Sequence, residues 1–143
     1  MIKDVYSLME PRMNERAISF VKKLDKNMKE ILIDPDGIYR SVLNLISNAM
    51  DVVEKGKGKI TVKTFYDDKN KKVEIEVEDN GAGIPREKLP QVFDLFYSSK
   101  SRGTGLGLAV SKKIIEERGG EITVHSEEGK GTVFTIILPH KDW

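Results

Sequence analysis

The sequence predicts an α+β two-layer sandwich, in which a mixed, mainly antiparallel sheet of about five strands is covered on one face by about three helices. Apolar and polar residues alternate in stretches such as residues 73–78, as expected for strands with one buried face. Other stretches, above all residues 35–54, place apolar residues three and four positions apart, which predicts amphipathic helices. Short polar turns between strand signals favour hairpins and therefore antiparallel pairing.

Length and composition narrow the possible classes of protein. The 143 residues are enough for one compact domain and little more, so residues 1–143 are predicted to form a single domain. A net charge of +1 gives no basic footprint, and a nucleic-acid partner is not expected. The sequence has no apolar run long enough for a membrane span and no signal-peptide pattern. The lack of cysteine excludes disulfides and fits a reducing, intracellular compartment.

Three elements are predicted before the strongest helix. Residues 1–16 have a helical pattern, which Pro11 is expected to kink, end or restart because proline lacks a backbone N–H. Residues 18–20 alternate as in an edge strand, and the short apolar run at residues 31–33 is consistent with a buried strand.

The helix predicted at residues 35–54 carries a polar row. Asp34-Pro35-Asp36 supply an N-cap acid, a proline at the first helical position and an acid near the positive helix end. Asn44, Asn48 and Asp51 lie four and three residues apart, away from the centre of the apolar arc. Because asparagine is a mediocre helix former, the row is either a solvated face or a set of oxygen ligands beside a cleft, suited to Mg²⁺.

The stretch Asp79-Asn80-Gly81-Ala82-Gly83 follows the strand predicted at residues 73–78. A carboxylate at a strand end can accept a hydrogen bond from a ligand, and glycines let the backbone lie against that ligand. Asn-Gly is also a turn signal, and for this stretch taken alone a simple turn is the better interpretation.

The second half of the chain adds two predicted helices and a hairpin. Pro85 opens a segment in which Leu89, Val92, Phe93 and Phe96 have the spacing of a short amphipathic helix. A second helix is predicted at about residues 106–118. Two closing strands are predicted around residues 122–124 and at residues 133–138, joined by a turn at residues 127–131.

The glycine-rich stretch at residues 103–108 runs directly into the predicted helix. Such a loop presents free backbone N–H groups at the positive end of the helix dipole, which predicts an anion site suited to phosphate. Lys100 and Arg102 add positive charge beside it. The glycine stretches match neither the P-loop nor the dinucleotide-binding motif. The informative feature is their order: Asn-x-x-x-Asn, then Asp-x-Gly-x-Gly, then Gly-x-Gly-x-Gly before a helix.

With these motifs the sequence resembles the catalytic, ATP-binding domain of bacterial sensor histidine kinases, in the superfamily that includes gyrase B, Hsp90 and MutL. The resemblance extends over essentially the whole chain as far as Leu138. It implies the Bergerat-type fold, ATP and Mg²⁺ as cofactors, and a mobile lid at residues 86–104 anchored by Phe93 and Phe96. The matching stretches are residues 44–51 (the N box), 79–83 (the first glycine box), 93–100 (the F box), 103–108 (the second glycine box) and 129–132 (the closing glycine turn).

The resemblance also implies roles for individual residues. Asp79 would accept a hydrogen bond from the adenine amino group, Thr132 would reach the adenine end, and Asn48 would hold Mg²⁺. Asn44 would face the phosphates and the water shell of the metal, and no general base is expected. The implied ATP-binding residues are Asn44, Asn48, Asp51, Asp79, Gly81, Gly83, Ile84, Lys100, Gly103, Thr104, Gly105, Leu106, Gly107, Leu108 and Thr132.

Two features depart from the family. Many members carry a lysine or arginine where Asp51 stands, and an acid cannot pair with phosphate, so Asp51 would bind a metal-bound water or face solvent. The acceptor histidine of the family lies on a separate dimerising helical hairpin, which this sequence lacks. His125 falls in a predicted strand and His140 in the tail, neither in an acceptor context.

The implied function is donation of the γ-phosphoryl group of ATP to a histidine in two-component signalling. The expected partners are the histidine-bearing dimerisation domain of the same kinase and a downstream response regulator. The domain alone is expected to be monomeric and cytoplasmic, whether or not the full-length protein is membrane-anchored, and not to autophosphorylate. Two alternatives stay open: a stand-alone serine protein kinase of the same superfamily, and a non-catalytic ATP-sensing module.

Overall fold

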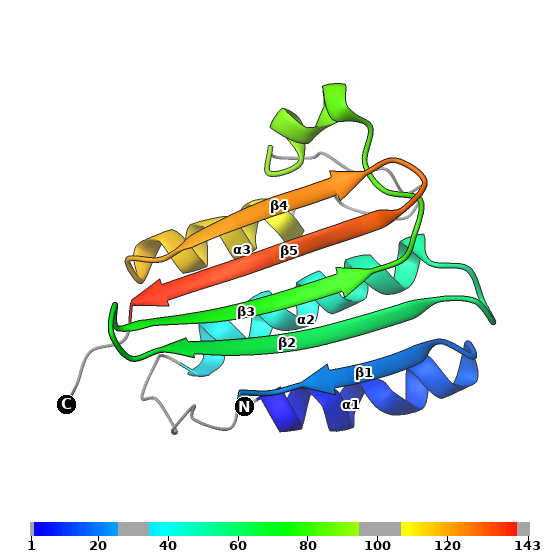
Figure 1. Ribbon diagram of the computed structural model, residues 1–143, viewed down its shortest axis with the longest axis horizontal. Helices are drawn as coiled ribbons and strands as arrows, with labels where there is room; N and C mark the ends of the chain where they lie inside the picture. Colours follow the sequence, from blue (N-terminus) through cyan, green and yellow to red (C-terminus); the bar gives the residue numbers. More distant parts are fainter. Residues whose placement is uncertain (1, 26–34, 95–106, 140–143) are drawn as a thin grey trace.

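The computed structural model describes residues 2–25, 35–94 and 107–139. Figure 1 shows one twisted sheet whose helices α1, α2 and α3 all lie behind it in this view. The elements in chain order are α1 (Ile2–Glu15), β1 (Ser19–Lys23), α2 (Pro35–Val52), β2 (Lys59–Asp67), β3 (Lys72–Asp79), the 3₁₀ helix η1 (Arg86–Gln91), α3 (Gly107–Glu117), β4 (Glu121–Glu127) and β5 (Gly131–Pro139).

The five strands lie in the order β1-β2-β3-β5-β4 (Figure 1). Strand β1 pairs in parallel with β2, and the other three pairs are antiparallel. The parallel pair needs a crossover between its strands, and α2 lies in that connection. The predicted mixed, mainly antiparallel sheet with helices on one face is confirmed.

Alternation along β3 separates the two faces of the sheet. Val73, Ile75 and Val77 are at most 1% exposed, whereas the glutamates between them are half-buried on the other face. The register sets Val77 opposite Val62 and Phe134, so the same face of three strands is apolar. Burying one such side chain stabilises the fold by about 1.5–3 kcal/mol. The strands therefore stack their apolar residues against the helix layer.

Helix α2 contributes the most completely buried helical surface. Ile38, Val42, Leu45 and Ile46 have no exposed surface, and they repeat with the period of the helix. The predicted helix at residues 35–54 is confirmed within two residues, a difference that is usual for helix ends.

Helix α1 continues through Pro11 to Glu15, so this proline does not end it. On either side of the proline, Met9 and Met13 are 3% and 0% exposed, and their packing holds both turns against the core. The ring of Tyr6 stacks on Phe20 of β1 with centroids 4.5 Å apart. The α1 helix thereby covers the β1 edge of the sheet.

The amphipathic helix predicted from Leu89 to Phe96 is wrong. The structure has the 3₁₀ helix η1, which ends before Val92. Pro90 lies inside η1 and has no N–H for an α-helical hydrogen bond, which explains the tighter, shorter helix. The apolar spacing instead reflects burial, because Val92 has no exposed surface and Phe93 packs edge-on against Phe134. Phe96 and the strand predicted at residues 31–33 lie outside the described residues.

Candidate functional site

The first group of site residues lies where β3 and β5 run side by side. Asp79 ends β3 and faces Thr132 of β5 in the strand register. Both residues are nearly buried, at 7% and 4% exposed. Since Asp79 continues the row of Val73, Ile75 and Val77, its side chain lies on the helix side of the sheet. A carboxylate is therefore held in a largely apolar layer, at the end of a strand.

The surroundings of Asp79 affect the pKa of its carboxyl group in both directions. Burial raises the pKa of the Asp79 carboxyl above its ordinary value, and the neighbouring Glu78 carboxylate adds a smaller upward effect. The backbone N–H groups of Gly81 and Thr132 oppose this by donating to the carboxylate, with Gly81 N–H 2.9 Å from Oδ1. The charged form thus has partners that fix its orientation.

The glycines near Asp79 allow chain segments to cross in direct contact. A Cβ on Gly83 would collide with the Glu127 carbonyl oxygen, and a Cβ on Gly131 would collide with that of Asp79. Both have positive φ angles, 76° and 130°. The predicted turn also exists, since the Gly81 N–H donates to the Asp79 side chain two residues earlier at 2.9 Å. The Asn80 side chain ties the segment to β2 by accepting from the Lys59 N–H at 2.8 Å. The glycine box is therefore a turn and a close approach at once.

Ser126 of β4 joins this group, and the sequence analysis missed it. Its Oγ accepts a hydrogen bond from the Ile84 N–H at 2.7 Å and donates to the Gly131 carbonyl oxygen at 2.9 Å. It also lies 2.8 Å from Thr132 Oγ1. The available signal was alternation: after Ile122 and Val124, the inward position holds a serine instead of an apolar residue. Ser126 fixes the segment after the first glycine box against the β4–β5 turn.

The second group of site residues lies between α2 and α3. Asn44 is half-buried, and its Nδ2 donates to Ser111 Oγ at 3.0 Å and towards the Gly107 carbonyl oxygen at 3.4 Å. Ser111 is completely buried and was not among the predicted site residues. Leu108, in the first turn of α3, packs against the core. The structure thus brings the N box together with the start of the helix that follows the second glycine box.

Helix α2 connects the two groups. Asn44, Asn48 and Val52 follow one another at intervals of four, so they lie along one side of the helix. Val52 reaches the first glycine box, because a Cβ on Gly81 would come within 2.6 Å of the Val52 carbonyl oxygen. Asn48, which is half-buried, therefore lies between the contact with α3 and the contact with Gly81.

The remaining predicted site residues have varied outcomes. Asp51 is exposed on α2. Of the predicted lid, the structure describes residues 86–94, and Phe93 contacts both Phe134 and, at 5.5 Å from its ring centroid, Lys112 Nζ. Five predicted phosphate-side residues lie outside the described residues: Lys100, Gly103, Thr104, Gly105 and Leu106.

The donor set fits Mg²⁺ held together with a phosphate ligand. Mg²⁺ usually keeps several waters, takes one or two protein oxygens and shares substrate phosphates. The side-chain amide of Asn48, which lies between the contact with α3 and the contact with Gly81, has one such oxygen. Within residues 2–25, 35–94 and 107–139, no three His, Cys, Asp or Glu residues gather where they could hold a metal by themselves. Phosphate oxygens and waters would complete the coordination of such an ion.

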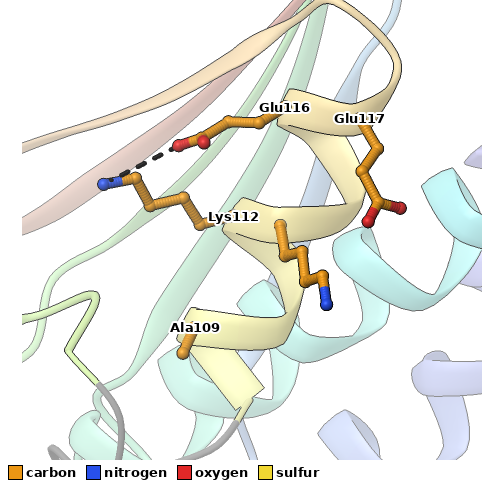
Figure 2. Close-up of a pocket in the computed structure, with 5 residues that line it drawn as sticks. Ala109, Lys112, Glu116 and Glu117 are labelled. Atoms are coloured by element: carbon orange, nitrogen blue, oxygen red, sulfur yellow. Dashed lines mark ion pairs between the residues drawn. The ribbon is translucent and has the colours of Figure 1, made fainter.

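A hollow of about 470 Å³ lies elsewhere, along the outer side of α3. Figure 2 shows its lining side chains, all from this helix, with Lys112 and Glu116 paired at 3.7 Å. Among the described residues no second element lines the hollow, and of the residues named in the paragraphs above only Lys112 belongs to it. We assign it no function. Its lining residues are Ala109, Lys112, Lys113, Glu116 and Glu117.

A five-stranded sheet with one helix-covered face, a buried aspartate at a strand end and two asparagines on one side of α2 match the ATP-binding domain expected from the sequence. In agreement, residues 33–142 match the family described as "Histidine kinase-, DNA gyrase B-, and HSP90-like ATPase". The chain belongs to this family.

Individual relatives agree with this assignment. The chain is 39% identical to Sporulation kinase E of Bacillus subtilis over 139 residues, which cover 96% of this chain and 18% of the relative. The catalytic domain of histidine kinase ThkA superposes with a TM-score of 0.85 at 33% identity, with 96% of this chain and 89% of that chain covered. ThkA bound to the response regulator protein TrrA gives 0.80 at 30% identity, covering 98% and 39%. Full-length ShkA in complex with AMPPNP gives 0.87 at 26% identity, covering 99% and 29%.

The curated kinases are much longer than this chain, which spans about a fifth of their length. Among the described helices, none is long and apolar enough to cross a membrane.

Proposed function

We propose that this domain binds ATP with Mg²⁺ and donates the γ-phosphoryl group to a histidine on a separate helical-hairpin domain, in two-component signalling. The observation that carries the proposal is the line from the buried Asp79 carboxylate, through Gly81 and Val52, to Asn48 and Asn44. The Asp79 end of this line suits the adenine ring, and the Asn44 end suits phosphate and metal. The sensor histidine kinases among the relatives support the same assignment.

At the adenine end, Asp79 accepts a hydrogen bond from the exocyclic amino group. Guanine has a carbonyl oxygen at that position, which would face the carboxylate, so the contact would favour ATP over GTP. Gly81 and Gly83 let the backbone approach the base. Thr132 and the Ile84 segment complete the pocket wall, held in place by Ser126.

At the phosphate end, Asn48 holds Mg²⁺ and Asn44 faces the phosphates and the metal's water shell. When bound, Mg²⁺ neutralises charge on the phosphate oxygens. The backbone of Gly105, Leu106 and Gly107 would bind phosphate, with Lys100 adding charge. Gly103, Thr104 and Leu108 are proposed neighbours of the same site.

Asn44 also sets what the site does with water. An amide cannot act as a general base at neutral pH, so it cannot activate water for attack on the γ-phosphate. Intrinsic hydrolysis should therefore be slow, which preserves ATP for transfer to the acceptor. The acceptor would be the histidine-bearing dimerisation domain of the same kinase, with a response regulator downstream. This function would be carried out in the cytoplasm, and the domain alone would be monomeric.

The test is calorimetric titration with ATP and GTP, with and without Mg²⁺, for the wild type and Asp79→Ala. Removing a hydrogen bond to a charged, buried group should weaken ATP binding by roughly 10- to 100-fold. Glu76→Ala is the matched control, because it removes a carboxylate of the same strand from the opposite face of the sheet. Unchanged ATP affinity in Asp79→Ala, or equal affinity of the wild type for GTP, would contradict the proposed site.

Phosphoryl transfer needs its own measurement. The domain is incubated with labelled ATP and either a helical hairpin carrying histidine or a serine-containing partner. Label on the histidine hairpin, sensitive to acid and stable to base, is the expected result. Label on serine alone would replace the histidine kinase with a serine kinase, and binding without transfer to any acceptor would support a sensing module.

A further inference from the structure

The side-chain amide of Asn44 is held by two acceptors of one neighbouring helix. Its Nδ2 lies 3.0 Å from Ser111 Oγ and 3.4 Å from the Gly107 carbonyl oxygen. Both acceptors belong to α3, and they lie one helical turn apart. The two N–H bonds of the amide therefore each have an acceptor on the same side.

This arrangement fixes which way the amide points. A backbone carbonyl oxygen can only accept, so the Asn44 nitrogen, and not its oxygen, must face Gly107. Oδ1 is the other polar atom of the planar amide and is not the atom that these two contacts occupy. It is therefore the atom that remains for the phosphate and metal proposed to bind beside Asn44 and Asn48.

Ser111 lies in a position where a hydroxyl group without a hydrogen bond would be destabilising. It has no exposed surface, and Ile115, one turn later on the same side of α3, has none either. Burying a hydroxyl costs free energy unless it forms hydrogen bonds, whereas a small apolar residue would fill the same space without that cost. The hydrogen bond from Asn44 offsets the cost of burying this hydroxyl.

We propose that Ser111 is a positioning residue, which together with the Gly107 carbonyl orients the Asn44 amide so that Oδ1 faces the phosphate and metal side of the site. The inference rests on the proposed function, because it assigns Ser111 a part in binding ATP·Mg²⁺. Without the hydroxyl, Asn44 keeps one long hydrogen bond, and its terminal torsion is free to rotate between two orientations.

The consequence is specific to one end of the nucleotide. Adenosine occupies only the adenine end, so it should bind equally well with or without the Ser111 hydroxyl. ATP·Mg²⁺ uses Oδ1 and its water contacts, so its affinity should fall by about 3- to 10-fold, the value of one ordinary hydrogen bond. A general loosening of the fold would weaken both ligands.

The experiment titrates adenosine and ATP·Mg²⁺ into the wild type, Ser111→Ala and Ser111→Cys by calorimetry. Cysteine keeps the size of the side chain and is a weak acceptor, so it tests the hydroxyl even where alanine disturbs folding. Ser41→Ala is the matched control: Ser41 is equally buried on α2, but its Oγ donates to the Gly37 carbonyl at 3.0 Å. The side-chain amide signals of Asn44 in nitrogen-15 NMR spectra report the orientation without any nucleotide.

The expected result is weaker ATP·Mg²⁺ binding with unchanged adenosine binding in both Ser111 variants, shifted Asn44 amide signals, and no such change in Ser41→Ala. Equal losses for both ligands, unchanged ATP·Mg²⁺ binding, or the same losses in Ser41→Ala would overturn the inference. A wild type that binds neither ligand would overturn the proposed function, and the Ser111 inference with it. The two failures are thus distinguished by the wild-type titration.

Discussion

The two ends of the candidate site are formed by different kinds of secondary structure. The adenine end consists of three adjacent strands, and its closest contacts are between backbone atoms at Gly83 and Gly131. The phosphate end lies between two helices, and in the described residues it is joined by the side-chain amide of Asn44. The first end is therefore specified by the path of the chain, and the second by the choice of side chains.

This difference has consequences for tolerance to substitution. Strand register fixes Asp79 opposite Thr132, and a slip of one residue would turn both side chains to the other face. Packed helices can shift slightly while keeping their contacts, so their hydrogen bonds adjust more easily. A side chain added at the close backbone contacts of the adenine end should therefore reduce stability strongly, whereas one added at the phosphate end should change stability little.

The largest expected effect comes from Gly131→Ala. The new Cβ would collide with the Asp79 carbonyl oxygen, and the φ angle of 130° disfavours any L residue. Strain and collision together should lower the free energy of unfolding by about 3 kcal/mol or more. Urea denaturation measures the loss. Gly129→Ala is the control in the same turn, since it has a positive φ but no atom near its Cβ, and it should cost only about 1 kcal/mol.

The counterpart at the phosphate end is Gly107→Ala. The nearest atom to its Cβ would be Asn44 Cγ at 3.9 Å, an ordinary contact, and Gly107 begins a helix. Since alanine favours helix more than glycine does, the free energy of unfolding should stay unchanged or rise by up to about 1 kcal/mol. A loss as large as that of Gly131→Ala would show that the two ends are equally constrained, and the comparison would fail.

The pH dependence of Asp79 should separate binding from stability. ATP affinity should fall as the pH is lowered through the raised pKa of Asp79, because protonation removes the charged acceptor. Stability changes in the opposite direction. Between the ordinary value of 3.8 and the raised value, the folded domain binds more protons than the unfolded chain, so the free energy of unfolding contributed by this group decreases as the pH rises.

Calorimetry and urea denaturation across an acidic to neutral pH series check both directions. Asp79→Asn is the control, because it removes the titrating group while preserving shape. It should bind ATP weakly at every pH and unfold with no contribution from position 79. If ATP affinity and the stability difference between the wild type and Asp79→Asn changed in the same direction with pH, the assigned direction of the shift would be contradicted.

The sequence predicted those parts of the molecule that depend on local pattern. Alternation along β3 and the period of α2 placed the buried faces, and the glycine motifs placed Asp79 at a strand end. The contacts it missed join residues far apart in the chain. Ser111 and Ser126 are single serines in apolar patterns, and nothing local to them indicates that they hold Asn44 and Ile84.

The wrong prediction around η1 has a similar explanation. The spacing of Val92 and Phe93 correctly indicated burial, but burial was interpreted as helix. The tertiary contact with Phe134, more than forty positions away, holds Phe93 without a helix. Pro90 is a local signal against an α-helix, because it has no backbone N–H for an α-helical hydrogen bond.

The smallest expected effect sharpens the comparison at the adenine end. Glu78→Gln removes the like charge beside Asp79 and should lower the pKa of Asp79, so the acid limit of ATP binding should move slightly towards lower pH. The lost ion pair with Lys63, 3.1 Å away and partly exposed, should change stability by about 0.5 kcal/mol or less. Lys63→Met tests the pair from its other side and leaves the Glu78 charge in place. If Glu78→Gln lowered ATP affinity at neutral pH, residues on the outer face of the sheet would take part in ATP binding. The adenine end would then depend on side chains as well as on its backbone contacts, and the comparison between the two ends would fail.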